Sequence, residues 1–291
     1  MRNATTYDLK YIENKSPDIK YSVNADIFET VVNTIGETAA QAFFENSLKS
    51  SDVFVMVNTL KCDANTIIND CGFAKSSVEN VLIAKSFSPK ELHFINGDYF
   101  VIDSSAAYTV GLSKPCADDT ILDLCAAPGG KTFCAAMLSG NKNAVTSLDL
   151  YPQRVNLIKT TAQKLGLKVN SFVNDATVYS PNIGKFSLVI CDVPCSGLGV
   201  IKRKPEIKHK NTADFADLPH IQLKILQTSA NYVDNGGRIL YSTCTLNCAE
   251  NENVVSAFLD NNQDFELVSK QYILPSQTGG DGFFAAIIKR K

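Results

Sequence analysis

One short segment restricts the possible folds of this chain more than any other. Residues 121–125 form an apolar run typical of a buried strand, and residues 132–138 have the composition of a helix. Between them the chain passes through Pro128, Gly129 and Gly130. A strand, a tight glycine turn and a helix N-terminus form one corner of an α/β nucleotide-binding site, where free N–H groups face the ligand. Glycine lets the backbone approach a ligand where a β-carbon would clash.

The chain that follows this corner alternates regularly between strands and helices. This alternation predicts a mostly parallel sheet from residue 117 onward. The expected strands are residues 121–125, 144–149, 168–173, 186–192 and 237–242. The expected helices are residues 130–139, 152–165, 217–234 and 249–261. Two closing strands, at residues 265–268 and 283–288, would add a hairpin, which fits a Rossmann-like α/β domain of the methyltransferase type.

The first 110 residues lack this alternation. Residues 21–49 have a helical pattern, and a short helix is expected between Asp63, as its cap, and Gly72, at its end. Short strands are expected at residues 53–57, 81–84 and 99–102. We therefore expect three parts: a tail or linker remnant at 1–20, a small α+β domain at 21–112 and a catalytic domain at 113–291.

Composition excludes several classes of protein. The net charge of −2 over 291 residues means that only a local patch could bind a polyanion. The nine cysteines lack framework spacing, no apolar run is long enough to span a membrane, and the polar N-terminus is no secretory signal. A reduced, cytoplasmic protein is expected. Two cysteine pairs are spaced by four, but histidine is scarce and C-x-x-C is absent, so we expect no metal.

Three aspartates follow successive expected strands: Asp149, Asp175 and Asp192. The carboxyl ends of parallel strands line the ligand crevice of an open α/β sheet. Taken singly, each aspartate would more often be a turn or cap residue. Together with the glycine turn they favour a nucleoside site, with Asp149 on the ribose and Asp175 on the adenine amine. The turn matches neither G-x-G-x-x-G nor the phosphate loop of ATP-binding proteins, so a dinucleotide or ATP is less favoured.

Two cysteines stand at the same edge as these aspartates. Cys195 lies just after the fourth strand, in Asp192-Val-Pro-Cys-Ser-Gly197, and Cys244 ends the fifth, in Tyr241-Ser-Thr-Cys-Thr245. A thiolate is a strong nucleophile once its pKa is lowered. Alone, each would more often be a small buried apolar residue. We predict a purely structural role for six of the other cysteines: Cys62, Cys71, Cys116, Cys134, Cys191 and Cys248. Cys125 belongs to the glycine corner.

Three strings, at residues 122–132, 192–197 and 241–245, together resemble the RNA 5-methylcytosine methyltransferases. The closest resemblance is to the bacterial RsmB/Sun group, which modifies a cytosine of small-subunit ribosomal RNA. Residues 250–252 and 281–284 also match, and the resemblance covers about residues 20–291. That group usually carries an all-helical NusB-like domain in front, which this chain is too short to hold. We expect either a truncated form or a shorter relative.

The resemblance implies a class I S-adenosylmethionine-dependent enzyme, with a seven-stranded, mostly parallel sheet behind a small RNA-recognition-like domain. Cys244 would add to C6 of cytosine, and Cys195 would assist release of the RNA. Asp192 would hold the N3/N4 edge of the base, and Lys131 would lie near it. The cofactor-binding residues are expected to be Cys125, Ala126, Ala127, Pro128, Gly129, Gly130, Lys131, Asp149, Arg154, Asp175 and Asp192.

The densest basic segment, residues 201–210, follows the Asp192 string directly. A solvated loop is the usual reading of such a run, but its position next to the expected active edge favours phosphate contact. The family commonly has Arg-Arg-His-Pro-Asp here, so this chain retains the charge without the identity. The expected RNA contacts are Lys202, Arg203, Lys204 and Lys208. The expected partner is ribosomal RNA, bound by a monomer without a membrane or a metal.

Other functions remain open on the sequence alone. An amino-methyltransferase would carry Asp/Asn-Pro-Pro-Tyr, whereas Cys195 stands here in the place of the aromatic residue. A cytosine of transfer RNA or another RNA could be the target. A ribosome assembly factor that binds RNA without catalysis could keep the same fold, although Cys244, Cys195, Asp192 and Lys131 are all present.

Overall fold

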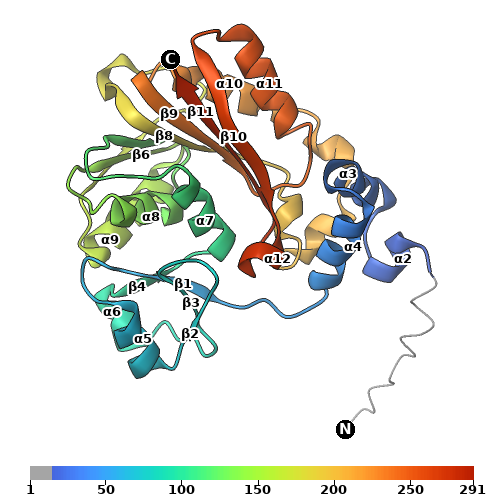
Figure 1. The fold of residues 1–291 in the computed structure, drawn as a ribbon, viewed down its shortest axis with the longest axis horizontal. Coiled ribbons are helices and arrows are strands. Elements are labelled where there is room, and N and C mark those ends of the chain that lie inside the picture. Colours follow the sequence, from blue (N-terminus) through green and yellow to red (C-terminus); the bar gives the residue numbers. More distant parts are fainter. Residues whose placement is uncertain (1–14) are drawn as a thin grey trace.

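A seven-stranded sheet forms the larger part of the molecule (Figure 1). The computed structural model describes residues 15–291. The strands are β5 (Ile121–Asp123), β6 (Val145–Asp149), β7 (Val169–Val173), β8 (Phe186–Asp192), β9 (Val233–Thr243), β10 (Phe265–Ile273) and β11 (Phe283–Arg290). Their order is β10-β11-β9-β8-β5-β6-β7, parallel from β9 to β7, with β11 antiparallel to both neighbours. The expected α/β class and sheet are confirmed.

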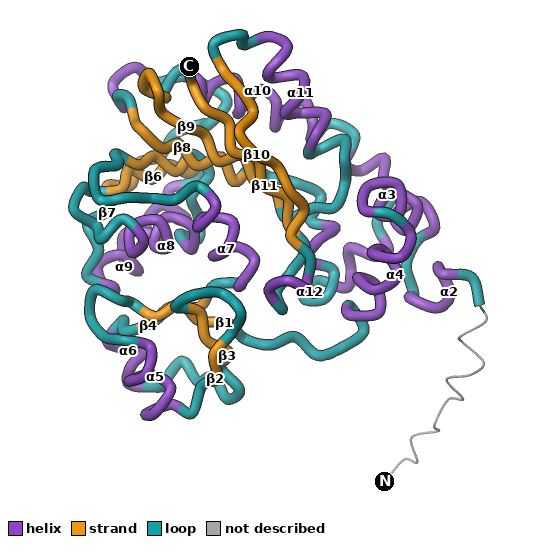
Figure 2. Tube along the Cα trace, in the orientation of Figure 1, coloured by secondary structure: helices purple, strands orange, loops and turns teal. Residues whose placement is uncertain are grey.

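Helices cover both faces of this sheet. They are α7 (Ser104–Leu112), α8 (Gly130–Leu138), α9 (Pro152–Leu165), α10 (Leu218–Ala230) and α11 (Glu252–Asn261). Alternate strand residues face opposite sides: Ile121 and Leu188 pack with α7, α8 and α9, whereas Leu122 and Val189 pack with α10 and α11 (Figure 2). Strands buried on both faces read as continuous apolar runs, which is why the sequence located them well.

The boundary between α10 and β9 differs from the expectation. The helix ends at Ala230 instead of residue 234, and the strand begins at Val233 instead of residue 237. Tyr232 is fully buried, its carbonyl accepts the N–H of Phe186 at 2.8 Å, and Val233 pairs with Phe186. The register then shifts before Leu188, so the strand continues through a glycine pair that reads as a break in the sequence.

A second, antiparallel sheet has the order β2-β3-β1-β4. Its elements are β1 (Phe54–Val57), α5 (Ala64–Cys71), β2 (Ala74–Lys75), β3 (Val81–Ile83), α6 (Leu92–Asn96) and β4 (Tyr99–Val101). As expected, Asp63 caps α5 by accepting two N–H groups, and Gly72 ends it. One face packs on α5, and the other, through Met56 and Phe100, packs on the α7–α8 side of the large sheet.

The helices at the start of the described chain pack elsewhere. They are α2 (Pro17–Tyr21), α3 (Ala25–Ile35) and α4 (Glu37–Asn46). Their apolar residues form one cluster with residues 198–215, on the far side of the molecule from the small sheet (Figure 1). Residues 21–112 therefore contribute to separate clusters. Of the expected tail, residues 17–20 belong to α2, and residues 1–14 lie outside the described residues.

Several short elements complete the description. They are the 3₁₀ turns at Pro181–Ile183, Leu198–Val200, Pro205–His209 and Thr212–Phe215, and helix α12 (Pro275–Thr278) in the loop between β10 and β11. Within residues 15–291, no helix has the length and apolar character needed to cross a lipid bilayer.

We predict that one contact between aromatic rings stabilises the packing of the small sheet against α8 of the large-sheet unit. Phe100 is buried and meets Phe133 of α8 edge to face, with centroids 5.7 Å apart. Phe100→Ala should lower the free energy of unfolding in urea by about 3–5 kcal/mol, because it leaves a cavity. Leu92→Ala is the control, since Leu92 is 66% exposed, and it should change stability by less than about 0.5 kcal/mol. Equal effects would contradict this account.

Candidate active site

A cavity of about 420 Å³ opens at the carboxyl edge of the large sheet. The glycine turn after β5, the ends of β8 and β9, the start of α7 and the basic segment all contribute to its wall. The polar side chains that line it include Asp123, Lys131, Asp192, Arg203 and Cys244. Several groups singled out from the sequence therefore share one space.

The glycine turn has a conformation that its residues require. Gly129 has φ +108°, and a β-carbon there would overlap the ring of Phe133. Gly130 begins α8, and a β-carbon there would only touch Ile102 at 3.6 Å, an ordinary contact. Thus the protein itself demands glycine at Gly129, and the expected demand at Gly130 does not come from surrounding protein atoms.

Asp149 and Arg154 fix the backbone of the glycine turn through hydrogen bonds to Ala127. Asp149 is 3% exposed, and its carboxylate accepts the N–H groups of Ala127 and Tyr151, both at 3.2 Å. Arg154 donates to the carbonyl of Ala127 at 2.7 Å and lies 3.4 Å from Asp149. Asp175 differs: it is exposed, does not line the cavity, and closes a local turn by accepting from the N–H and hydroxyl of Thr177, each at 2.8 Å.

Asp123 is a candidate that the sequence reading missed. It is fully buried and lines the cavity; one oxygen accepts from Thr132 at 2.7 Å, and the other has no hydrogen-bond partner. Burial raises its pKa to about 7, against the opposing effect of the Thr132 hydrogen bond. A charged residue inside an apolar strand was the available signal, since buried charges seldom lack a purpose.

Lys131 and Asp192 form an ion pair across the cavity. Their nitrogen and oxygen lie 2.7 Å apart, and Ser242 donates to the second Asp192 oxygen at 2.9 Å. Burial favours the neutral amine of Lys131, but attraction to Asp192 and the hydrogen bond outweigh it, so the pKa of Lys131 is raised. The same ammonium group lies 4.9 Å from the ring centroid of Phe283. The ammonium group of Lys131 therefore stays charged beside the cavity.

The two singled-out cysteines are in contact. The sulfurs of Cys195 and Cys244 lie 3.3 Å apart, although 49 residues separate them in sequence. The hydrogen bond from Cys195 lowers the pKa of Cys244, aided by Lys131, against burial and the charge of Asp192. The same hydrogen bond and burial raise the pKa of Cys195. The pair thus favours a thiolate at Cys244 and a thiol at Cys195.

The basic segment begins beside this pair. The N–H of Gly199 donates to the carbonyl of Cys244 at 3.0 Å, and the carbonyl of Gly199 accepts the N–H of Gly282 at 2.9 Å. A β-carbon on Gly199 would overlap the Gly282 carbonyl. The backbone segments at residues 199, 244 and 282 can therefore lie this close together only because residue 199 is glycine. This backbone ladder fixes where the basic side chains emerge.

Those side chains differ in what they can reach. Arg203 and Lys204 are exposed and line the cavity, and Arg203 forms an ion pair with buried Asp281. Lys202 is half-buried beside Asn46. Lys208 is placed differently: the side chain is 5% exposed, its ammonium donates to the carbonyl of Tyr21 at 3.3 Å, and burial lowers its pKa. The expected RNA contact of Lys208 stays a prediction, with less support from the structure than those of Arg203 and Lys204.

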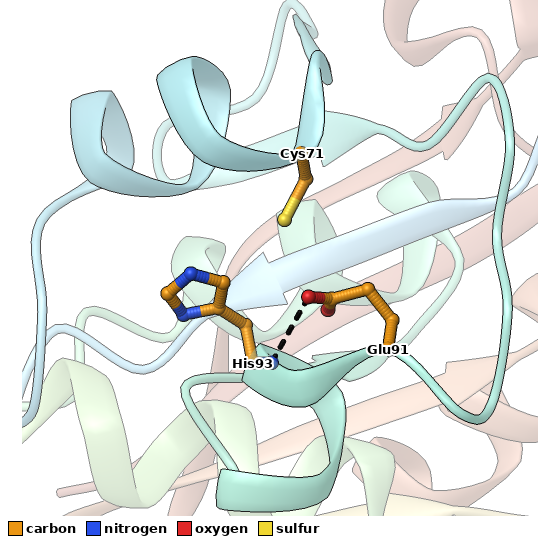
Figure 3. Close-up of side chains that lie close together, drawn as sticks. All are labelled: Cys71, Glu91 and His93. Carbon is orange, nitrogen blue, oxygen red and sulfur yellow. Dashed lines mark hydrogen bonds between the residues drawn. The ribbon is translucent and has the colours of Figure 1, made fainter.

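A separate cluster of Cys71, Glu91 and His93 lies in the small sheet unit (Figure 3). The ring nitrogens of His93 lie 2.8 Å from Asp98 and 3.2 Å from Asp70. Glu91 accepts the N–H of His93 at 3.0 Å as the cap of α6. Burial, then the charge of Glu91, raise the pKa of Cys71 to about 11, so a thiolate ligand is disfavoured. The cluster is explained by its internal hydrogen bonds.

The sheet order, the glycine turn and the polar cavity at the carboxyl edge define a Rossmann-like methyltransferase. A model of the 16S rRNA methyltransferase RsmB/F family matches residues 110–289. The chain belongs to this family, which uses S-adenosylmethionine.

Individual relatives agree with this membership. A probable ribosomal RNA small subunit methyltransferase B of Bacillus subtilis is 35% identical, over 81% of this chain and 59% of the relative. The protein of the same name from Synechocystis is 36% identical, over 68% of this chain and 49% of the relative. The crystal structure of PH0851 has a TM-score of 0.88 at 25% identity, covering all of this chain and 70% of that one. The crystal structure of NSun6 from Pyrococcus horikoshii with SFG has a TM-score of 0.82 at 18% identity. It covers 92% of this chain and 98% of that one, and this likeness shows the fold. The chain spans about half to three fifths of the length of these two curated relatives.

The residues present fit the cofactor of the family. S-Adenosylmethionine carries an ammonium and a carboxylate on its methionine part. Asp123 lines the cavity and has one oxygen without a hydrogen-bond partner, and the first N–H groups of α8 have no partner within the helix. These complementary groups lie beside the turn at residues 125–130.

We predict that the His93 cluster stabilises the fold in acid more than in base. The hydrogen bond to Asp98 raises the pKa of His93, despite burial. A raised pKa adds stability that is complete below the ordinary pKa of histidine and disappears as pH rises through the raised value. In urea unfolding, His93→Gln should therefore destabilise the protein more at about pH 5.5 than at about pH 8.5. An equal loss at both pH values would remove the charged interaction from the explanation.

Proposed function

We propose that this protein methylates C5 of a cytosine in RNA, with small-subunit ribosomal RNA as the substrate, through a covalent bond between Cys244 and C6 of the base. The observation that carries the proposal is the Cys244–Cys195 contact at 3.3 Å on the same cavity as the Lys131–Asp192 pair and the glycine turn. Membership of the RsmB/F family supports it.

The cofactor side of the cavity is proposed to be the turn at residues 125–130. S-Adenosylmethionine supplies an electrophilic methyl group when bound. Asp149 and Arg154 fix the backbone of Ala127, so they position the turn and are proposed to bind the cofactor as well. Asp123 is proposed to accept from the ammonium group. Asp175 keeps its proposed adenine contact, and its exposure leaves it free for one.

The chemistry of the base side follows from the charges. Cytosine is a poor electrophile, so addition of a thiolate at C6 is needed to make C5 electron-rich. A thiolate is favoured at Cys244 by the hydrogen bond from Cys195 and by Lys131. Asp192 is proposed to accept N–H groups from N4 and from protonated N3, which stabilises the ring as the sulfur adds.

Release of the base reverses the first step. Once C5 carries the methyl group, its proton passes to water and the electron pair of the C–H bond re-forms the C5–C6 double bond. The C6–S bond then breaks, and its electron pair returns to Cys244 as a thiolate. Cys195 is the hydrogen-bond partner of that sulfur, so it is proposed to stabilise the departing thiolate. This gives the two cysteines different roles: one forms the bond, and the other assists its breaking.

The RNA is proposed to contact the exposed rim formed by Arg203 and Lys204, and then half-buried Lys202. Lys208 is the weakest of the four proposed contacts, because it is buried. Phosphate contacts there would position the strand. The target base must leave its stack to enter a cavity of this kind, which costs a few kcal/mol and least in an unpaired loop. Residues 21–112 are proposed to extend the RNA surface. A cytoplasmic monomer that holds no metal remains our prediction.

Two substitutions test the roles of the cysteines. Cys244→Ala should lower the rate of cytosine methylation by at least about 10³-fold while leaving the affinity for S-adenosylmethionine nearly unchanged, because only the bond-forming sulfur is lost. Cys195→Ala should leave a protein–RNA adduct that survives a denaturing gel, because release is slowed. Bisulfite sequencing of ribosomal RNA identifies the cytosine. Normal methylation by the Cys244→Ala protein would exclude the covalent route.

A calorimetric titration tests the cofactor side. Asp149→Ala leaves the N–H of Ala127 unpaired, so it should weaken S-adenosylmethionine binding by about tenfold or more, in line with the value of a hydrogen bond to a charged group. Asp52→Ala is the control, because Asp52 is exposed and does not line the cavity, so the affinity should stay the same. Unchanged affinity after Asp149→Ala would argue against the proposed cofactor site.

A further inference from the structure

Glu250 is a fully buried carboxylate next to the two cysteines, and the reaction as described does not use it. Its oxygens accept from the N–H of Ser196 at 2.8 Å, the Ser196 hydroxyl at 2.5 Å, Gln222 at 2.9 Å and Asn247 at 3.0 Å. All four donors are neutral groups. Burying a charge with only neutral partners is expensive, and a cost of this kind calls for a compensating role.

The hydrogen bonds of Glu250 connect the two cysteine loops. Ser196 directly follows Cys195, and its hydroxyl lies 2.7 Å from that of Thr245, which directly follows Cys244. The carbonyl of Glu250 accepts the hydroxyl of Tyr241, near the end of β9, at 2.6 Å. One residue thereby sets the position of both loops relative to each other.

The charge of Glu250 acts unequally on the two sulfurs. It disfavours a thiolate at Cys195 and contributes to the raised pKa of that group. On the other side, the positive charge of Lys131 favours a thiolate at Cys244. A negative charge beside one sulfur and a positive charge beside the other give the pair a fixed polarity.

Other charged or titratable groups also face the pair, from several elements. They are Asp192 at the end of β8, which acts on both sulfurs, Asp281 before β11, Arg203 of the basic segment, and Tyr241 of β9. Asp192 and Asp281 each disfavour a thiolate at Cys244. Glu250 bonds directly to Ser196, the residue after Cys195, and reaches Thr245, the residue after Cys244, through the Ser196 hydroxyl. It is therefore the negative group placed to separate the two sulfurs.

We propose that Glu250 is a positioning residue that keeps the shared proton of the thiol pair on Cys195, so that Cys244 is the sulfur that attacks. The pair then holds a single proton: the Cys244 proton has passed to solvent, and Cys195 retains its S–H and donates it to the Cys244 thiolate. The consequence for the reaction rests on the proposed function, whereas the location of the proton can be measured without RNA or cofactor.

The test is alkylation of the intact chain with iodoacetamide over about pH 6 to about pH 10, followed by mass spectrometry of the cysteine peptides. Cys116 is exposed and serves as the internal reference for reagent strength. In the unaltered protein, Cys244 should react before Cys195. In Glu250→Gln, which keeps the shape and removes the charge, the ratio of Cys244 to Cys195 alkylation should fall by about tenfold, the effect of one pKa unit.

Two variants separate charge from structure. Glu250→Asp keeps the charge and should keep Cys244 as the first site. Asn251→Ala removes neutral hydrogen bonds to Thr243 and Thr245, of 2.6 Å and 3.0 Å, so it should change both rates without reversing their order. Thermal melts establish that each variant is folded.

An unchanged ratio in folded Glu250→Gln would overturn the proposal. So would alkylation of Cys195 before Cys244 in the unaltered protein, a result that stands even if Glu250→Gln fails to fold. If the protein proved not to methylate RNA while the ratio shifted as expected, the proposed function would fail and the assignment of the proton would remain.

Discussion

The ion pair between Lys131 and Asp192 joins the two halves of the site. Lys131 belongs to the first turn of α8, directly after the glycine turn, and Asp192 ends β8, so a bond of 2.7 Å connects the proposed cofactor side with the proposed base side. Taking both charges out of water is costly, and only close geometry with further hydrogen bonds offsets that cost. Ser242 supplies one of them, from β9. Thus three elements of the large sheet unit meet at one buried contact.

Three further buried carboxylates lie at the same edge of the large sheet as this ion pair. Asp123, Glu250 and Asp281 are each almost completely buried. Their surroundings differ: Asp123 has an unpaired oxygen, Glu250 has neutral donors, and Asp281 has a guanidinium partner. Burial and the nearby Asp103 raise the pKa of Asp281 to about 6 although Arg203 opposes them. Since such groups weaken a fold unless they are compensated, their concentration at one edge marks that edge as the functional one.

The sequence predicted the elements better than the contacts between them. The strands of the large sheet were readable because they are buried on both faces, and Cys195 and Cys244 were recognisable because each follows a strand at the same edge. Lys208 shows the limit: Lys204 and Lys210 in the same basic segment are exposed, but the partner of Lys208 is the carbonyl of Tyr21, 187 residues away. A contact at such separation leaves no local pattern. Glu250 was matched as part of a motif, yet two of its partners, Ser196 and Gln222, come from other segments.

The position of the small sheet limits how RNA can be held. In RNA-recognition domains, bases stack on aromatic residues of an open sheet face. Here the face that carries Phe100 is closed by α7 and α8, and the opposite face is closed by α5. Neither face offers a stacking surface, so contributions of this unit must come from its edges and loops. The charged groups with access to the cavity are then those of the rim, Arg203 and Lys204, which the Gly199 ladder fixes beside Cys244. If the proposed function holds, the RNA strand is positioned from the side of the cavity, with Cys244 next to the proposed phosphate contacts.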